Sequence, residues 1–406
     1  MISTYINKTV SFRYSKENLS FHLSHGLFSS HGVDSGSMFL LKIIAAKINP
    51  AGVKSILDIG SGTGIIGISL KKKNPEAALT MVDRDALALA FSRENSSLNG
   101  IDDGSVTYKP GLMFFDDNKQ NQPRKGYDLI VSNLPAKAGA LVLDEFFKNS
   151  ILSLNKGGSA GVVIVNTLGD TAEKAINKYN GKITFSESTK EHRVFIYGTG
   201  EKKTGGNPEK DFLAPYIRLK KEFSRKKISY TLETVYNLPD FDVAGYALNT
   251  ALDILNGLTL KGDLLFWEPG QGHIPVCLSK KEKRISSCTL AGRDFLSLKI
   301  SERNLAEKNI RHSTIFVPDF PFIQGLIEPE SFDGAVISFY PIPGVNKDRE
   351  IYKTAIYTLK KDGILVLYGK SSSLYRFIKG NPGLKIINTK KHRGFRCIAL
   401  KKPGKA

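Results

Sequence analysis

The sequence is poor in cysteine, with only Cys277, Cys288 and Cys397 among 406 residues and no CxxC pair. This spacing argues against a disulfide framework and against a cysteine-based zinc site. Long apolar runs are also missing, because stretches such as AGVVIV at 160–165 are far too short to cross a bilayer. The N-terminal MISTYINKTV lacks the apolar core of a secretory signal. We therefore expect a cytoplasmic protein with no membrane segment and no metal site.

Acidic residues are outnumbered, with 58 Lys and Arg against 39 Asp and Glu, a formal net charge of +19. Residues 1–203 hold 25 basic and 19 acidic residues, whereas residues 204–406 hold 33 and 20, which gives +6 and +13. Excess positive charge attracts polyanions and gains affinity by releasing their counterions. This charge favours a nucleic-acid partner, most plausibly RNA, over a basic surface that serves only solubility.

The second half of the chain repeats the first in the same order. The matching segments are VDRDALALAFSRENSSLNGI (82–101) with AGRDFLSLKISERNLAEKNI (291–310), LDIGSGTG (57–64) with WEPGQGHI (267–274), YDLIVSNLP (127–135) with FDGAVISFYP (332–341), and TKEHRVF (189–195) with TKKHRGF (389–395). Four ordered matches indicate an internal duplication whose copies have diverged.

A polar segment rich in Gly, Pro and Lys, EKKTGGNPEKD at 201–211, separates the copies. We predict domains at 1–203 and 213–406, joined by a linker at 204–212. Within each copy, short apolar runs bounded by turn residues alternate with longer amphipathic stretches, as in SILDI followed by GIIGISLKKK. This alternation predicts an α/β fold of two tandem domains, each a mostly parallel twisted sheet with helices on both faces.

The loop LDIGSGTG follows a predicted strand and opens a predicted helix, which is the position of a nucleotide-binding glycine loop. Gly60, Gly62 and Gly64 can adopt tight backbone conformations and allow close approach to a ligand. Asp58 precedes them and can hold an ammonium group. Asp83 ends the next predicted strand, 25 residues after Asp58, where it can accept hydrogen bonds from ribose hydroxyls.

The pattern DxGxGxG differs from the GxGxxG of dinucleotide folds, which serves a pyrophosphate. It resembles motif I of the class I methyltransferases, whose cofactor, S-adenosylmethionine, has a zwitterionic tail and no phosphate. The resemblance implies Rossmann-like domains that bind S-adenosylmethionine at Asp58, Gly60, Gly62, Gly64 and Asp83, together with the adjacent Arg84.

A second motif, VSNLPAKAG at 131–139, ends the fourth predicted strand at the edge where open sheets bind ligands. It resembles [ND]PP[FYW] of methyltransferases that modify exocyclic or amide nitrogens. In that family the Asn side chain and the next backbone carbonyl accept hydrogen bonds from the target amine, which implies catalytic roles for Asn133, Leu134 and Pro135. Leu134 replaces the first Pro, and Ala136 replaces an aromatic that stacks on a flat target base. The structural alternative is that Asn-x-Pro only turns the chain.

A third stretch, LFSSHGVDSGSMFLL at 27–41, resembles a segment of the ribosomal RNA guanine-N2 methyltransferases, where Asp and Gly-Ser lie over the cofactor pocket. The resemblance adds Asp34, Gly36 and Ser37 to the cofactor site, although Asp34 or Ser35 also suits a helix cap. Those enzymes carry two tandem copies, of which the N-terminal one is usually degenerate. Here the order is reversed.

The second copy is predicted to be inactive, because Gly64 aligns with Ile274, Asp83 with Gly292, and Asn133 with Phe339 or Tyr340. Its basic clusters, including Lys220-Lys221, Arg225-Lys226-Lys227, Lys280-Lys281 and Lys390-Lys391-His392-Arg393, suit a phosphate-binding surface or, alternatively, solvated helix ends and turns.

One departure from the family concerns adenine. Many members have an acid after the Gly that follows the third strand, where this chain has Leu112 after Gly111. Asp116 and Asp117 stay unassigned.

Together these features predict an S-adenosylmethionine-dependent N-methyltransferase that acts on an exocyclic nitrogen, most plausibly of guanine in ribosomal RNA. Two alternatives stand beside it: a methyltransferase of a protein amide or small-molecule amine, and a non-catalytic basic RNA-binding module.

Overall fold

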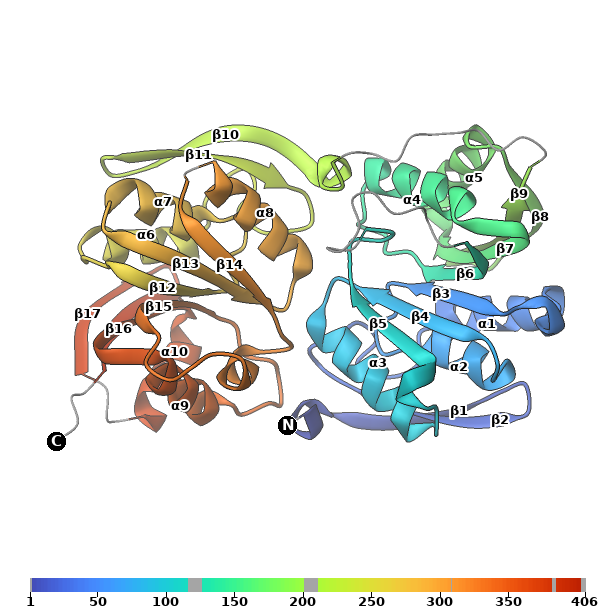
Figure 1. Cartoon of the computed structure of the whole chain (residues 1–406), viewed down its shortest axis with the longest axis horizontal. Helices are drawn as coiled ribbons and strands as arrows, with labels where there is room; N and C mark the ends of the chain where they lie inside the picture. Colours follow the sequence, from blue (N-terminus) through green and yellow to red (C-terminus); the bar gives the residue numbers. More distant parts are fainter. Residues whose placement is uncertain (1, 116–125, 201–210, 308, 382–384, 403–406) are drawn as a thin grey trace. The chain divides into compact units, whose positions relative to one another are not determined.

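The computed structural model describes all residues except 1, 116–125, 201–210, 308, 382–384 and 403–406 (Figure 1). The chain folds into two compact units, Met1–Tyr216 and Ile217–Ala406. The N-terminal unit extends beyond the expected linker at 204–212, because Leu213 and Tyr216 are buried and the short helix η5 (Ala214–Tyr216) contacts a helix of that unit. Asp116 and Asp117 lie outside the described residues.

The N-terminal unit begins with the antiparallel hairpin β1 (Lys8–Tyr14) and β2 (Glu17–Leu23). A sheet of seven strands follows, in the order β5-β4-β3-β6-β7-β9-β8. Its first five strands are parallel, β9 pairs antiparallel with β7, and β8 pairs antiparallel with β9. The strands are β3 (Ser55–Ile59), β4 (Ala78–Asp83), β5 (Val106–Pro110), β6 (Tyr127–Asn133), β7 (Leu154–Val165), β8 (Gly181–Ser188) and β9 (His192–Thr199).

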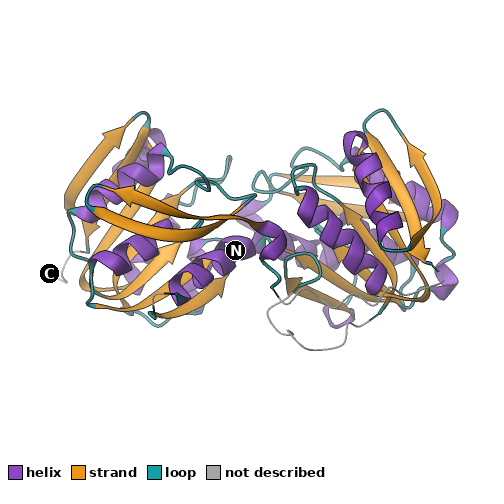
Figure 2. Ribbon diagram, turned by 90° about the horizontal axis from the view of Figure 1, so that it is seen from above, coloured by secondary structure: helices purple, strands orange, loops and turns teal. Residues whose placement is uncertain are grey.

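Helices cover both faces of this sheet (Figure 2). The helices are α1 (Ser35–Lys47), α2 (Ile65–Lys73), α3 (Ala86–Leu98), α4 (Ala140–Leu152) and α5 (Gly169–Lys178). Leucines and isoleucines of α1 and α2 form one core cluster with Val194 and Ile196 of β9. The adjacent Tyr197 contacts Phe147 of α4, with ring centroids 6.0 Å apart. Since successive side chains of a strand point to opposite faces, α4 packs on the face opposite to α1.

The C-terminal unit repeats this plan. The hairpin β10 (Ile217–Arg225) and β11 (Ile228–Val235) precedes a seven-stranded sheet in the order β14-β13-β12-β15-β16-β18-β17. The sheet strands are β12 (Gly262–Trp267), β13 (Ile285–Gly292), β14 (Arg311–Phe316), β15 (Phe332–Phe339), β16 (Leu359–Lys370), β17 (Lys385–His392) and β18 (Phe395–Lys401). The helices are α6 (Tyr246–Asn256), α7 (His273–Lys281), α8 (Phe295–Ala306), α9 (Asp348–Thr358) and α10 (Ser371–Gly380). The predicted tandem α/β fold is therefore confirmed.

A buried asparagine of a helix ties the leading hairpin to the glycine loop in both units. The Asn95 amide donates to the carbonyls of His22 and Thr63 at 3.1 and 2.8 Å. Asn304 makes the same pair of bonds to Glu233 and Gln271, at 2.8 and 2.9 Å. These equivalent networks show that Asn95 and Asn304, which the sequence repeat aligns, have a structural role that both copies retain.

Candidate active site

A cavity of about 680 Å³ opens in the N-terminal unit at the carboxyl ends of the parallel strands. This volume is typical of small-molecule and cofactor sites, and the carboxyl edge is where open α/β sheets bind ligands. Its lining comprises Phe28, Ser29, Asp34, Ser37, Ile59, Gly60, Ser61, Gly62, Thr63, Ile65, Ile66, Val82, Asp83, Arg84, Gly111, Leu112, Met113, Ser132, Asn133, Leu134, Pro135, Ala136, Lys137, Val165, His192 and Tyr216. Most of the residues singled out in the sequence thus meet at one cavity.

The glycine loop between β3 and α2 forms the floor of the cavity. Gly60, Gly62 and Gly64 all have positive φ angles, of 73°, 57° and 84°. A Cβ atom on Gly60 or Gly62 would meet nothing within 4 Å, whereas one on Gly64 would lie 2.7 Å from a side-chain carbon of Ile68. The first two glycines therefore leave room for a ligand beside the backbone, and Gly64, which does not line the cavity, allows α2 to pack closely.

Asp83, at the end of β4, is a fixed acceptor in this cavity. Its Oδ2 accepts a hydrogen bond from the Gly62 N–H at 2.8 Å, and its Oδ1 accepts one from the Asp85 N–H at 2.9 Å. Burial, followed by the charge of Asp85, raises the pKa of Asp83 to about 6. The carboxylate keeps further lone pairs for hydroxyl donors, as a ribose-binding acid requires. The following residue, Arg84, also lines the cavity.

Asp58 does not line the cavity with the other predicted residues. Its side chain is 1% exposed, and Oδ2 accepts a hydrogen bond from the Gly67 N–H of α2 at 2.8 Å. Its Oδ1 has no hydrogen-bond partner among the residues that the structure describes, and burial raises the pKa of Asp58 to about 7. The described contacts of Asp58 hold α2 against β3 beneath the glycine loop, so they give no support to a direct role in binding an ammonium group.

Asn133, at the end of β6, is held by two residues from the start of α1. Its Nδ2 donates to Asp34 Oδ2 at 2.7 Å and to Ser37 Oγ at 3.0 Å. Both amide protons are therefore directed at α1, and the carbonyl oxygen is the polar atom of the amide left for a ligand. Asp34 Oδ2 also accepts from the Ser37 N–H at 2.9 Å and caps α1. The cap and the site role predicted for Asp34 are thus compatible.

Leu134 and Pro135 follow Asn133 along the cavity wall. Leu134 is buried, and its N–H donates to the Val163 carbonyl at 2.9 Å, while the Pro135 carbonyl accepts from the Ala138 N–H at 3.1 Å. The motif does turn the chain, as the structural alternative holds, and it also carries Asn133 into the cavity. The two interpretations therefore do not exclude each other.

Gly36, a predicted site residue, allows the side chains of Asp34 and His192 to approach each other closely. A Cβ atom there would lie 3.0 Å from Asp34 Oδ2 and 3.1 Å from Nε2 of His192. Gly36 is not among the lining residues, and its hydrogen atom leaves space for the His192 ring beside Asp34.

Sequence reasoning missed His192, Tyr216 and Phe28 as cavity residues. His192 was visible only as part of a repeated TKxHR segment, and Tyr216 lies beyond the linker, so no local motif marked them. Phe28, 79% exposed, belongs to the segment at 27–41 that resembles the guanine-N2 methyltransferases, but it was not assigned to the site. An exposed aromatic at a cavity is a feature that only the structure reveals.

The glycine loop of the C-terminal unit aligns differently from the sequence expectation. Gly272 precedes α7 with φ 88°, as Gly64 precedes α2 with φ 84°. The pairing of Gly64 with Ile274 is therefore wrong, because the short repeat was aligned two residues out of register. Gly270, with φ 63°, likewise corresponds to Gly62.

The region equivalent to that of Asp83 keeps an acid in the C-terminal unit, supplied by a different residue. Gly292 does stand in the place of Asp83, just before the residue pair that leads into the next helix. However, Glu268, at the position of Gly60 and with φ 53°, places its carboxyl carbon 3.5 Å from where a Gly292 Cβ would lie. Glu268 Oε1 accepts a hydrogen bond from the Arg293 N–H at 2.9 Å. A carboxylate thus occupies this region even though the strand-end acid is lost.

The Asn133 network has no counterpart among the described residues of the C-terminal unit. Strand register places Ser338, rather than Phe339 or Tyr340, at the position of Asn133, because Asn133 pairs with Val163 and Ser338 with the equivalent Tyr368. The residue that precedes α6 is Gly245, which replaces Asp34, and Leu248 replaces Ser37. The amide is thus replaced by a shorter hydroxyl side chain and the other two polar side chains are lost, whereas the structural Asn304 is kept.

Several basic clusters of the C-terminal unit are neutralised within the unit. Lys220 pairs with Glu307 at 2.8 Å, and Arg225 and Lys390 pair with Asp253 at 2.7 and 2.6 Å. Pairing lowers the positive potential that these side chains offer to phosphate. In contrast, Lys227, Lys280 and Lys391 have no ion pair among the described residues.

The comparisons with known proteins agree with this geometry. Five parallel strands closed by an antiparallel pair, with a glycine loop after β3 and an acid at the end of β4, define a class I methyltransferase fold, whose members use S-adenosylmethionine. The chain belongs to the methyltransferase small-domain family, whose model matches residues 18–196. None of the helices in the described parts of the chain is long and apolar enough to span a membrane.

Two relatives illustrate the range of the match. The uncharacterized protein YbxB of Bacillus subtilis (strain 168) is 32% identical over 171 residues, which cover 42% of this chain and 80% of that protein. Ribosomal RNA small subunit methyltransferase C of Haemophilus influenzae (strain ATCC 51907 / DSM 11121 / KW20 / Rd) is 32% identical over 151 residues. That match covers 36% of this chain and 42% of the relative, so it spans less than half of the enzyme's length.

The similarity to solved structures extends over both units. The Thermus thermophilus 16S rRNA N2 G1207 methyltransferase (RsmC) in complex with AdoMet and guanosine matches with a TM-score of 0.67 and 15% identity. The match covers 99% of this chain and 100% of that one. At this level of identity the likeness concerns the fold, and it confirms two tandem methyltransferase-like domains.

Proposed function

We propose that the N-terminal unit transfers a methyl group from S-adenosylmethionine to the exocyclic N2 amine of a guanine in ribosomal RNA. The observation that carries this proposal is the orientation of Asn133. Its two amide protons are bonded to Asp34 and Ser37, which leaves a fixed carbonyl oxygen to accept a hydrogen bond from a target amine.

The cofactor cavity fits a nucleoside with a short polar tail. Open space beside Gly60 and Gly62 lets the backbone approach the ligand, and Asp83 accepts hydrogen bonds from the ribose hydroxyls. The cofactor supplies an electrophilic methyl group on a sulfonium centre. The chain supplies the orientation of donor and acceptor, which can account for much of the rate of a bimolecular transfer.

At the acceptor side, the target amine donates to Asn133 Oδ1 and to the Leu134 carbonyl. These two bonds fix the plane of the amine and direct the nitrogen lone pair towards the methyl group. Because the acceptors act by orientation, no strong base is required at the nitrogen. The ring of Pro135 fixes the φ angle of the residue that follows these two acceptors.

Two observations support RNA as the substrate. Relatives of the N-terminal unit include ribosomal RNA small subunit methyltransferases, and the fold of the whole chain matches an enzyme of 16S rRNA. The chain also carries an excess of positive charge, of which residues 204–406 hold 33 basic against 20 acidic residues. We assign RNA binding to the C-terminal unit and catalysis to the N-terminal unit.

The proposal is tested by incubating the full chain with radiolabelled S-adenosylmethionine and either ribosomal RNA that lacks the modification, cellular protein or a metabolite extract. Nucleoside analysis should recover the label as N2-methylguanosine from the RNA. Label in protein or in a small amine, with none in RNA, would overturn the substrate. Asn133→Ala serves as the control, since it removes the acceptor without touching the ribose-binding Asp83.

A further inference from the structure

The wall of the cofactor cavity includes a residue from outside the family domain. The family model ends at residue 196, yet Tyr216 of η5 lines the same cavity as Gly60 and Asp83. Tyr216 is 5% exposed, so its ring belongs to the packed structure of the N-terminal unit.

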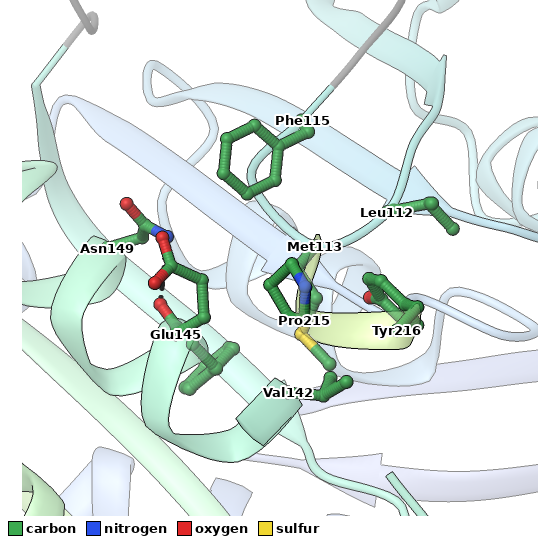
Figure 3. Close-up of a pocket in the computed structure, with 9 residues that line it drawn as sticks. Leu112, Met113, Phe115, Val142, Glu145, Asn149, Pro215 and Tyr216 are labelled. Atoms are coloured by element: carbon green, nitrogen blue, oxygen red, sulfur yellow. Dashed lines mark hydrogen bonds between the residues drawn. The ribbon is translucent and has the colours of Figure 1, made fainter. Parts of the chain in front are cut away.

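Apolar packing holds this segment in place. Pro215 and Tyr216 line a second, small cavity together with Leu112, Met113 and Phe115 (Figure 3). Val142 and Phe146 of α4 also line that small cavity. In the same segment, Phe212 lies against Phe115, with ring centroids 6.3 Å apart.

The sheet order shows which end of the cavity Tyr216 occupies. Leu112 and Met113, which line both cavities with Tyr216, follow β5 at the edge of the sheet. Gly111 is bonded to the end of β4, since its N–H donates to the Asp83 carbonyl at 3.1 Å. Asn133 lies on β6, on the other side of β3. Tyr216 therefore lies beside the loop that follows β5, at the nucleoside end of the cavity.

Among the described residues that line this end of the cavity, Leu112 follows Gly111 directly after β5. Leu112 is 1% exposed and apolar, so it offers no hydrogen bond to a base. An aromatic ring can instead contribute by stacking on the face of a purine or by contacting its edge.

We propose that Tyr216 contacts the adenine ring of the cofactor, so that the methyl-donor site is completed by the segment that follows the family domain. The inference rests on cofactor binding at this cavity, which is part of the proposed function, and not on the RNA substrate. Adenine affinity would then depend on apolar contact with Tyr216, and the site would require residues up to 216.

Calorimetry on full-length variants tests this inference, with S-adenosylhomocysteine as the probe. Tyr216→Leu, which keeps an apolar side chain and removes the ring, should raise Kd about ten-fold, whereas Tyr216→Phe should stay within about three-fold. Phe212→Ala is the matched control, because it loosens the same segment without removing a cavity residue. The melting temperature of each variant without ligand shows that it is folded.

A second probe locates the contact. 5′-Deoxy-5′-methylthioadenosine keeps the adenine and ribose but lacks the amino-acid tail, so its Kd should rise by the same factor in Tyr216→Leu. An unchanged Kd in Tyr216→Leu, an equal loss in Phe212→Ala, or a loss that spares this probe would each overturn the inference. If instead RNA is not the substrate, the Kd differences persist and only the methylation assay fails.

Discussion

Replacing Asp34 by Ala should separate the orientation of Asn133 from the binding of cofactor. Asp34 Oδ2 accepts one hydrogen bond from Asn133 Nδ2 at 2.7 Å and one from the Ser37 N–H at 2.9 Å. Without the carboxylate, the Asn133 amide is no longer fixed with its oxygen towards the cavity. Asp34 is therefore expected to act through Asn133, as a positioning residue.

The magnitude follows from the kind of bond that is lost. A hydrogen bond to a charged group contributes about 1.5 to 3 kcal/mol, which corresponds to roughly 10- to 150-fold in kcat/KM if the orientation matters only in the transition state. Ser37→Ala removes a neutral hydroxyl acceptor 3.0 Å from Asn133 Nδ2, worth about 0.5 to 1.5 kcal/mol, and should cost a few-fold. The expected order of activity is wild type, then Ser37→Ala, then Asp34→Ala.

The assay is steady-state methyl transfer at saturating cofactor, with Kd for S-adenosylhomocysteine and melting temperature measured in parallel. Asp34→Ala also removes a helix cap, which costs about 1 kcal/mol of stability. Asp294→Ala provides the matched control, because Asp294 caps α8 by accepting from the Leu296 N–H at 3.0 Å and belongs to the other unit. If Asp34→Ala loses stability as Asp294→Ala does but keeps activity within three-fold of wild type, the positioning argument is refuted.

Four further outcomes are expected. Asn133→Ala should abolish methyl transfer while Kd for the cofactor stays within about two-fold, and substantial remaining activity would reduce the motif to a turn. Asp83→Ala should weaken cofactor binding by roughly 10- to 100-fold in calorimetry, because charge-assisted hydrogen bonds to the ribose are lost. The wild type should bind one cofactor per chain, and two equivalent sites would contradict this assignment. Because burial raises the pKa of Asp58 to about 7 in the folded state, its contribution to stability is lost as pH rises from about 4 through 7. The melting temperature without cofactor should therefore fall less between pH 5 and 8 in Asp58→Asn than in the wild type. Parallel pH curves for the two proteins would contradict this expectation. Lys227 and Lys280 have no ion pair among the described residues, and replacing both by Gln should lower the affinity for RNA. The slope of log K against log salt should decrease by up to about 2. An unchanged slope would show that these two side chains do not contact RNA phosphates.

The sequence predicted the features that depend on local pattern. Alternating apolar runs gave the βα order of both units, since the period of buried residues differs between strands and helices. The spacing of Gly60, Gly62 and Asp83 gave one wall of the cavity, because a βα turn and the end of the next parallel strand must meet at the same edge. The duplication was also visible in the sequence as ordered matching segments. Asn95 and Asn304, which these matches align, occupy equivalent buried positions in the structure.

Other features were beyond sequence reasoning because they join residues far apart in the chain. Asn133 meets Asp34 across 99 positions, and Tyr216 reaches the cavity from beyond the linker. Asp58 matched the motif but turns towards Gly67, because a buried carboxylate accepts the nearest backbone N–H that is open to it. Only tertiary packing decides which neighbour that is.

The sequence by itself thus determined the fold class, the duplication and the glycine loop with its acid, because each is written in residues close together or at fixed strand ends. The tertiary structure decided the register of the second copy, where Gly272 rather than Ile274 matches Gly64, and the pairing of Lys220 and Arg225 with acids of the same unit. It alone oriented the Asn133 amide, since a side chain's direction depends on partners that the chain brings together only on folding.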